Sequence, residues 1–404
     1  MAEGADKGKA QAEAAPPPAR AIAILAIAAF ASAANLRVCD PLLPQIAGEL
    51  GVTVGTAALM VTAFALAYGL SQVAVGPLGD ARGKLLMVVL GSVWAGIASI
   101  ASAGAPSIGP LTVARFVAGI GAAAVVPVAL AWLGDVVPYE RRQPVLARFI
   151  SGQILGIVFG QAAGGLLGEL IGWRGALAML GLVHIAAGLL LYAEMRRLKA
   201  GVPVPGRARW RQSAEQSWAM LQDRWVRIVL ITVFIEGLAM FGALAYIGAD
   251  LHQRFGLNLG TVGALLASFG AGALAYSFTA GRMVARLGQP GLTAFGAMAL
   301  AGGYVVIALM PWAWLAAPAI AFVGLGYYMI HNTLQTNATQ MAPEARGLAL
   351  SIFAFTLFCA QSIGVALAAP VMDRFGGRPI FLIAAAIIVA IAYWFRRELL
   401  QKPA

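Results

Sequence analysis

The chain has 404 residues, of which 60% are hydrophobic and 11% charged, and its mean hydropathy is +0.82. Soluble proteins average roughly 45–50% apolar and about 25% charged residues, so the composition excludes a water-soluble globular protein and indicates a polytopic membrane protein. The net charge of +11 would suggest nucleic-acid binding in a soluble chain, but in a membrane protein it first marks sidedness. Cys39 and Cys359 lie in apolar runs and provide neither a disulfide framework nor a metal site.

About twelve apolar stretches are long enough to cross a bilayer. We place them at 20–46, 52–76, 84–105, 108–132, 143–167, 173–195, 226–250, 258–281, 290–311, 313–337, 347–369 and 378–396. Residues 1–19, rich in Ala, Pro, Lys and Glu, predict a disordered cytoplasmic tail. Ala31-Ser32-Ala33 resembles a signal-peptide cleavage site, but the apolar run continues past it, so we expect no cleavage there.

The longest connection, residues 196–225, divides the spans into two sets of six. It is basic and contains two prolines: Arg196, Arg197, Lys199, Pro203, Pro205, Arg207, Arg209 and Arg211. Trp210, Trp218 and Trp225 beside these bases favour either a segment on the membrane surface or a solvated linker. We therefore predict an N-terminal bundle (20–195), a cytoplasmic linker (196–225), a C-terminal bundle (226–396) and a cytoplasmic tail (397–404).

The distribution of Lys and Arg predicts the orientation. Most of the 28 basic residues lie on the side of the two termini, whereas the opposite loops hold only Arg174, Arg254, Arg374 and Arg378. Because cytoplasmic loops carry the excess of basic residues, we expect both termini in the cytoplasm, with the protein in the cell (inner) membrane. The charge is thus topological, with lipid as a partner and no nucleic acid.

The two halves repeat each other at one constant offset. Gly51, Gly55, Thr56, Gly76, Gly83, Gly119, Gly121, Pro138, Arg141 and Gly172 recur as Gly256, Gly260, Thr261, Gly281, Gly288, Gly324, Gly326, Pro343, Arg346 and Gly377. An ungapped match over more than half of each set of spans indicates a parallel duplication. Secondary transporters bind their substrates at such repeat interfaces, near the midplane.

The loop between the second and third spans carries a recognisable motif. Residues 76–84 read GPLGDARGK, similar to the GxLaDrxGrk signature of the major facilitator superfamily, with departures at Ala81 and Leu85. Along its whole length the chain resembles a transporter of that family, in the drug:proton antiporter-like group. The resemblance implies an all-α membrane protein of 12 transmembrane helices in two pseudo-symmetric six-helix bundles. It also implies a cytoplasmic gate motif of Gly76, Asp80, Arg82, Gly83 and Lys84. The copy of this motif at residues 281–288 has Ala285 in place of Asp80, so we expect it to form a weaker gate contact.

Two further motifs support the resemblance. Arg115 begins RFVAGIGAA, similar to the family's RxxqGxgaa motif, which implies a role in proton transfer; a buried structural ion pair is the alternative. In the fifth span, GIVFGQAAGG resembles the antiporter signature GxxxGPxxGG, with Gln161 in place of the proline. Its glycines allow helices to approach closely, so helix packing alone is an alternative explanation. These antiporter-like positions are Gly156, Gly160, Gly164 and Gly165.

Four charged residues lie within the predicted spans: Arg37, Asp40, Arg115 and Glu236. Unpaired ions in a membrane cost several kcal/mol each, so we expect pairing among the four. Burial favours the protonated form of a carboxyl group, as a proton carrier requires. Two arginines at similar depth favour the ionised form of Asp40, so Glu236 is the preferred proton carrier. Asp40 is then either a second carrier or a structural partner of Arg37 or Arg115.

The tenth span has a polar face with helical spacing, formed by Tyr328, His331, Asn332 and Gln335. With residues from other spans it could line a substrate cavity suited to an amphipathic ligand: Asn35, Gln153, Gln161, Tyr246, Phe358 and Gln361. Each residue alone could instead make a helix–helix hydrogen bond. We interpret His184 as structural and place His252 in a loop, so no metal site is expected.

The sequence thus favours a secondary active transporter, acting as a monomer without cofactors. The preferred function is export of small amphipathic molecules in exchange for protons, driven by a proton gradient. Uptake or exchange of an organic anion or sugar-like solute, with Arg37 and Arg115 binding a carboxylate, is the alternative, and a membrane scaffold is a remote one. No Walker motif or catalytic constellation is present, so neither ATP hydrolysis nor enzyme activity is expected.

Overall fold

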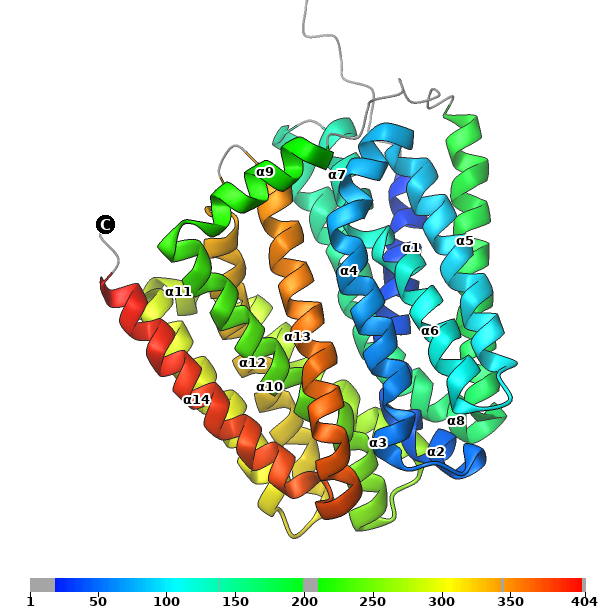
Figure 1. Ribbon diagram of the computed structural model, residues 1–404, viewed down its shortest axis with the longest axis vertical. Coiled ribbons are helices and arrows are strands. Elements are labelled where there is room, and N and C mark those ends of the chain that lie inside the picture. Colours follow the sequence, from blue (N-terminus) through cyan, green and yellow to red (C-terminus); the bar gives the residue numbers. More distant parts are fainter. Residues whose placement is uncertain (1–18, 138, 199–209, 343–344, 402–404) are drawn as a thin grey trace, which may run out of the picture.

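The computed structural model describes residues 19–137, 139–198, 210–342 and 345–401. Residues 1–18 of the predicted 1–19 tail and residues 199–209 of the predicted linker lie outside the described residues, as do Pro138 and Pro343 of the repeat. Regular structure in the described part is entirely helical, and the long helices run side by side between two ends of the molecule (Figure 1). We call the end where α1 (Ala19–Arg37) begins the terminal face and the end with α2 (Leu43–Leu50) and α3 (Val54–Ala57) the distal face.

The helices follow the predicted spans. The N-terminal half adds η1 (Asp40–Leu42), α4 (Leu59–Arg82), α5 (Lys84–Ala103), α6 (Ile108–Ala123), α7 (Val125–Val136) and α8 (Tyr139–Arg197). The C-terminal half contains α10 (Arg224–Phe255), α11 (Leu259–Leu309), η2 (Ala313–Leu315), α12 (Ala316–Ala338), α13 (Arg346–Phe375) and α14 (Gly377–Gln401). Within the described residues, ten helical segments are long and apolar enough to cross a membrane. Two of them, α8 and α11, contain a non-helical glycine, Gly172 and Gly288, that divides each into two crossings, consistent with the twelve predicted spans.

Left-handed glycines mark the same turns in both halves. Gly51 and Gly256 each have φ 65°, and Gly83 and Gly288 have φ 96° and 59°. Only glycine adopts such angles without a steric cost, which explains why the turns recur as glycines. The third pair corrects the predicted alignment by one residue, because the left-handed partner of Gly172 (φ 75°) is Gly376 (φ 73°) and not Gly377.

Glycines inside the helices also make equivalent contacts. A Cβ atom on Gly119 would collide with the carbonyl oxygen of Phe64, and one on Gly324 with that of Phe269, the residue at the same offset. Gly121 likewise lies against Gly91, as Gly326 does against Gly296. The repeat is therefore a repeat of helix packing, in which small residues let backbones approach closely.

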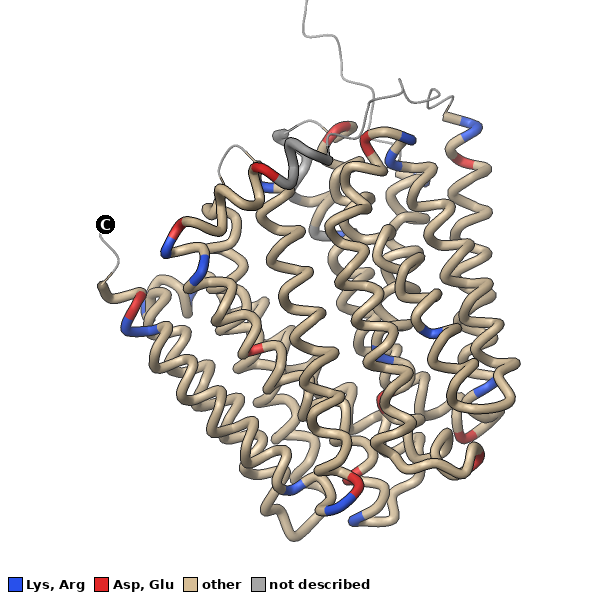
Figure 2. Tube along the Cα trace, in the orientation of Figure 1, with Lys and Arg blue, Asp and Glu red and all other residues tan. Residues whose placement is uncertain are grey.

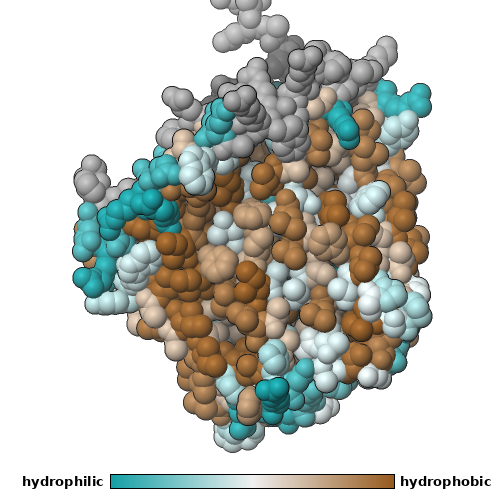
Figure 3. All heavy atoms as spheres, in the orientation of Figure 1, coloured by the Kyte–Doolittle hydropathy of each residue, from teal (hydrophilic) through white to brown (hydrophobic). Residues whose placement is uncertain are grey.

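The exterior suits a bilayer. Charged residues concentrate towards the two ends of the molecule, and few lie between them (Figure 2). Apolar residues cover the middle of the visible face, while hydrophilic residues gather near its ends (Figure 3). Large exposed apolar side chains, including Phe278 at 83% and Leu170 at 69%, are therefore placed to contact lipid tails.

The connection between the halves includes a short helix, α9 (Trp210–Leu221). Its Trp218 is exposed, while Trp225 stacks on Phe395 of α14 at 6.1 Å. Arg224 Nη2 lies 2.8 Å from Glu398 Oε2, so the start of α10 is tied to the end of α14. The predicted C-terminal tail is helical as far as Gln401.

Candidate substrate and coupling site

The first ionic pair lies where the first span breaks. α1 ends at Arg37, and η1 begins at Asp40 with Pro41, which has no N–H to continue a helical hydrogen-bond ladder. Arg37 Nη1 lies 3.6 Å from Asp40 Oδ2, and both side chains are buried. The backbone oxygen of Asp40 is near Gly248 of α10, where an added Cβ would meet it at 3.2 Å. This pair thus faces the C-terminal half.

Arg115 is held by neutral groups. Its guanidinium donates to the side-chain and backbone oxygens of Asn35, with the latter at 2.7 Å, and stacks 4.3 Å over the ring of Phe64. Asn35 in turn donates to Ser99 Oγ at 2.9 Å. Among the described residues, no carboxylate lies within ion-pair distance of Arg115, so of the four charges predicted to pair with one another only Arg37 and Asp40 do so. The equivalent position in the repeat, Ile320, is fully buried and apolar.

The second buried pair of titratable groups lies in the C-terminal half. Glu236, in the middle of α10, places Oε2 2.9 Å from His331 Nδ1 of α12. Glu236 is fully buried, and His331 stacks on Tyr327 with ring centroids 4.8 Å apart. The sequence assigned His331 only to a cavity-lining face, and its pairing with Glu236 was not predicted. Nothing in the spacing links two residues on different helices.

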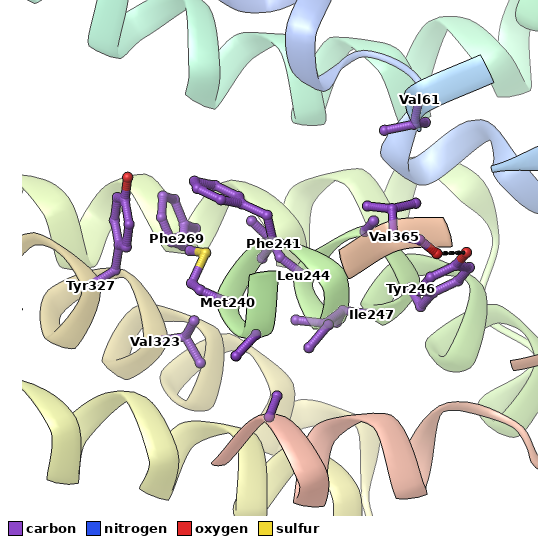
Figure 4. Packing of buried hydrophobic residues seen from close by; sticks show 14 of the residues in the cluster. Val61, Met240, Phe241, Leu244, Tyr246, Ile247, Phe269, Val323, Tyr327 and Val365 are labelled. Carbon is purple, nitrogen blue, oxygen red and sulfur yellow. Dashed lines mark hydrogen bonds between the residues drawn. The ribbon is translucent and has the colours of Figure 1, made fainter. Parts of the chain in front are cut away.

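Aromatic rings connect the two pairs across the interface between the halves. The guanidinium of Arg37 lies 4.4 Å from the ring centroid of Phe241, one turn beyond Glu236 on α10. Phe241 makes an edge contact with Tyr327 at 5.3 Å, and Tyr327 carries the stacked His331. Figure 4 shows Phe241, Phe269 and Tyr327 directed towards one another from three helices. A continuous chain of contacts therefore runs from Asp40 to Glu236, and sequence reasoning missed Phe241 and Tyr327.

Several buried polar atoms beside these pairs have no hydrogen-bond partner among the described residues. They are Asp40 Oδ1 and Oδ2, both amide atoms of Gln161, Glu236 Oε1 and both amide atoms of Gln361. Buried polar groups in proteins are normally hydrogen-bonded, because leaving one unpaired costs about 1–3 kcal/mol. Such atoms are suited to take a proton or to bind polar groups of a ligand.

The other predicted cavity residues separate into two groups. Tyr246 is buried in the C-terminal half and donates to the carbonyl of Val365 at 2.9 Å, a packing contact visible in Figure 4. Asn332 donates to Tyr276 at 2.8 Å, and Gln335 is exposed. The partly buried residues are Gln153, Tyr328 and Phe358, of which Phe358 contacts Tyr68 of α4 across the interface at 4.5 Å.

The predicted gate motif makes its contacts inside the N-terminal half. Lys84 Nζ lies 3.4 Å from Asp80 and 2.6 Å from Asp135 at the end of α7. Gly83, with φ 96°, forms the turn between α4 and α5, and Arg82 is exposed. A Cβ on Gly76 would meet no described atom within 4 Å. The gate role of this motif stays a prediction.

The antiporter-like glycines pack helices. Added Cβ atoms on Gly156 and Gly160 would collide with the α1 backbone at Phe30 and Ala34, and one on Gly164 with the backbone of Val38, directly after α1. Gly165 instead lies against Leu259 and Gly263 of α11, across the interface between the halves. Close packing is therefore sufficient to explain this motif.

The remaining histidines, His184 and His252, lie apart from the two pairs. His184 is fully buried in α8, and His252 Nδ1 lies 2.7 Å from the carbonyl of Leu257. In the part of the chain that the structure describes, no three His, Cys, Asp or Glu residues are grouped to bind a metal ion.

Comparisons with known proteins place this architecture in a family. The family model described as Major Facilitator Superfamily matches residues 25–365. The chain belongs to the Major Facilitator Superfamily. It is similar to the MFS-type transporter YwfA of Bacillus subtilis, with 26% identity over 371 residues that cover 90% of this chain and 88% of the relative. It is also 26% identical to a chloramphenicol resistance protein of Streptomyces lividans over 373 residues, covering 91% and 93% of the two chains.

The fold is also that of a solved superfamily structure. A bacterial homologue of the human lysosomal transporter Spinster, described as inward-facing and unoccupied, aligns with a TM-score of 0.75 and 15% identity, covering 96% of this chain and 99% of that chain. The protein is thus a multi-pass membrane transporter of small molecules rather than an enzyme.

Proposed function

We propose that this superfamily member is a proton-coupled exporter of small amphipathic molecules that works by alternating access. The observation that carries the proposal is the chain of contacts joining the Asp40–Arg37 pair to the Glu236–His331 pair through Phe241 and Tyr327. Because this series of contacts crosses between the two halves, a change of charge at one pair would alter the contacts that the halves make with each other. The basic bias of the terminal face supports a cytoplasmic location for that face.

The Glu236–His331 pair is suited to carry the proton. The carboxyl and imidazole groups can share one hydrogen bond either as an ion pair or as two neutral groups, so the proton can move between them with no change of net charge. Release of that proton leaves the pair with the negative charge of Glu236, which a proton-coupled transporter would have to compensate by a change of conformation or by a bound ligand. Glu236 Oε1 has no partner among the described residues and remains a candidate contact for a polar ligand group.

The lining supports an amphipathic substrate. Rings of Phe241, Phe269, Tyr327 and Phe353 lie beside the Glu236–His331 pair and offer apolar and edge-on contacts. The similar protein of Streptomyces lividans is a chloramphenicol resistance protein, so chloramphenicol is a rational first compound to test.

The test is drug-driven proton release from proteoliposomes containing the full-length protein. A thermal-shift screen of drugs and metabolites at two pH values, beginning with chloramphenicol, selects the compound. We expect Glu236→Gln to abolish proton release and Asp40→Asn to reduce it, while Glu398→Gln, at an end of the molecule beside Arg224, serves as the matched control. Coupled transport that survives both site substitutions at the wild-type level would exclude the proton roles.

A second function is supported by the surroundings of Arg115. Its buried guanidinium has only neutral partners among the described residues, so it could bind the carboxylate of an organic anion together with Arg37. Exchange of an organic anion would then persist without a proton gradient. Arg37→Lys would abolish it, because lysine lacks the planar fork of the guanidinium.

A further inference from the structure

The two halves are joined at the distal face by two carboxylate contacts in equivalent positions. On one side, Asp373 near the end of α13 accepts a hydrogen bond from Thr53 Oγ1 at 2.7 Å and one from the backbone N–H of Gly55 at 2.8 Å. On the other side, Glu169 of α8 accepts one from the backbone N–H of Gly260 in α11 at 2.9 Å. Both contacts cross from one half to the other.

The repeat relates these two contacts to each other. Gly55 and Gly260 are one of the repeated glycine pairs, and Thr53 and Asn258, at the same offset, both cap the following helix turn by accepting from Thr56 and Thr261. On the carboxylate side, Asp373 precedes the left-handed Gly376 by the same number of residues as Glu169 precedes the left-handed Gly172. The duplication has therefore kept a carboxylate and the backbone N–H that donates to it in both halves.

Both donor sites are glycines that the carboxylate approaches closely. A Cβ on Gly55 would lie 2.5 Å from Asp373 Oδ2, and one on Gly260 would lie 2.7 Å from Glu169 Oε2. Neither glycine has a left-handed φ, so space and not backbone conformation favours glycine. At Gly55 a Cβ would also lie 2.6 Å from the backbone oxygen of Ala369, whereas at Gly260 the carboxylate of Glu169 is the close neighbour. Backbone N–H groups at the start of a helix attract negative charge, which favours the carboxylate as the partner.

The halves approach each other differently towards the terminal face. On the distal side, Gly165 of α8 lies against Gly263 of α11, and Gly69 of α4 lies against Phe358 of α13. Near the terminal face, the repeated glycines Gly76 of α4 and Gly281 of α11 would accept a Cβ with no described atom within 4 Å. Of these glycine positions, those that contact the other half lie on the same side of the molecule as the carboxylate contacts.

We propose that Asp373 and Glu169 are gating residues, whose paired contacts with Thr53, Gly55 and Gly260 hold the distal face closed and must separate before a substrate site can open there. The proposal requires transport by alternating access, but it is independent of the direction of transport and of the coupling ion. Asp373 accepts two hydrogen bonds across the interface and Glu169 one, so the contact at Asp373 is the stronger of the two.

The test measures the distance between the halves at the distal face of the full-length protein in lipid nanodiscs. The native cysteines are first removed by Cys39→Ala and Cys359→Ala. Spin labels are then attached at Ser107→Cys and Trp312→Cys, which occupy repeat-equivalent exposed positions, and double electron–electron resonance measures the distance between them. We expect Asp373→Ala to increase the population of longer distances by about three- to tenfold, as for the loss of an ordinary, solvent-accessible hydrogen bond. Glu169→Ala should increase it less, and the double variant most.

Glu49→Ala provides the matched control. Glu49 is another distal carboxylate, but it contacts Trp173 and Arg174 of its own half, so its removal should leave the distances unchanged. Asp373→Asn keeps one acceptor oxygen and should give an intermediate shift, and thermal unfolding of each variant identifies any that fail to fold. Distance distributions for Asp373→Asn and Glu169→Ala that match those of Glu49→Ala would overturn the proposal.

Discussion

The first and seventh spans occupy equivalent places in the two halves but differ in continuity. In the N-terminal half, α1 stops at Arg37 and the chain passes through η1, with Pro41, before α2 resumes. In the C-terminal half, α10 continues through the same region, with Tyr246 at the position equivalent to Pro41. Discontinuous helices in transporters place backbone and side-chain polar groups at binding sites. The duplication thus supplies a common frame in which one half has a broken helix and the other does not.

The charged groups differ between the halves in the same way. Arg37 and Asp40 correspond to Gly242 and Ala245, while Arg115 corresponds to Ile320. Conversely, Glu236 corresponds to Ala31 in the first span. Since each charge is replaced by a small or apolar residue in the other half, the fold does not require it. We therefore propose that the charges serve the function, and each can be tested against its uncharged counterpart.

The largest expected effect on stability comes from separating the pair in the C-terminal half. His331→Leu leaves Glu236 buried without its partner, which should lower the free energy of unfolding by about 3–5 kcal/mol at pH 8. The loss should be smaller at pH 5, because protonation of Glu236 removes the unpaired charge. Denaturant unfolding in mixed micelles measures both values, and Glu236→Leu/His331→Leu should recover most of the stability. If Glu236→Leu/His331→Leu is no more stable than His331→Leu, the loss of stability does not come from the unpaired Glu236.

Removal of equivalent glycines should destabilise both halves alike. Gly119→Ala and Gly324→Ala each drive a Cβ into the carbonyl of the neighbouring helix, at Phe64 and Phe269, so each should cost about 1–3 kcal/mol. Gly302→Ala is the control, because its Cβ would meet no described atom within 4 Å. If only one of the two variants, Gly119→Ala or Gly324→Ala, lowers the unfolding midpoint, the two packing arrangements are not equivalent.

The helices, turns and duplication could be predicted from the sequence because their signals are local or repeated. Span length, glycine spacing and the constant offset predicted the helices, the turns and the duplication. The contacts of the site were not readable in the same way. His331 pairs with Glu236 from another helix, and Phe241 connects the pairs only because α10 faces α1 and α12. Such contacts depend on how helices rotate about their axes, which span length and glycine spacing do not determine.

Replacing the N-terminal charge of Arg115 by its C-terminal counterpart should affect stability less than His331→Leu does. Arg115→Ile removes the donor to Asn35 and should cost about 1–3 kcal/mol, because the amide oxygen is left unpaired. The double variant Arg115→Ile/Asn35→Met copies Ile320 and Met240, both buried, and should be more stable than the single variant. Transport should be lost in both. If transport persists in the double variant, Arg115 is a structural residue only.

The smallest expected effect distinguishes packing from substrate contact at Tyr246. Its hydroxyl donates to Val365 inside the C-terminal half, so Tyr246→Phe should cost about 0.5–1.5 kcal/mol of stability and leave substrate selectivity unchanged. Tyr304→Phe, which removes a similar buried hydrogen bond to the carbonyl of Met240, is the matched control. A change of selectivity in Tyr246→Phe but not in Tyr304→Phe would instead support the cavity role predicted from the sequence. In that case the continuous seventh span, like the broken first span, would contribute directly to the substrate site.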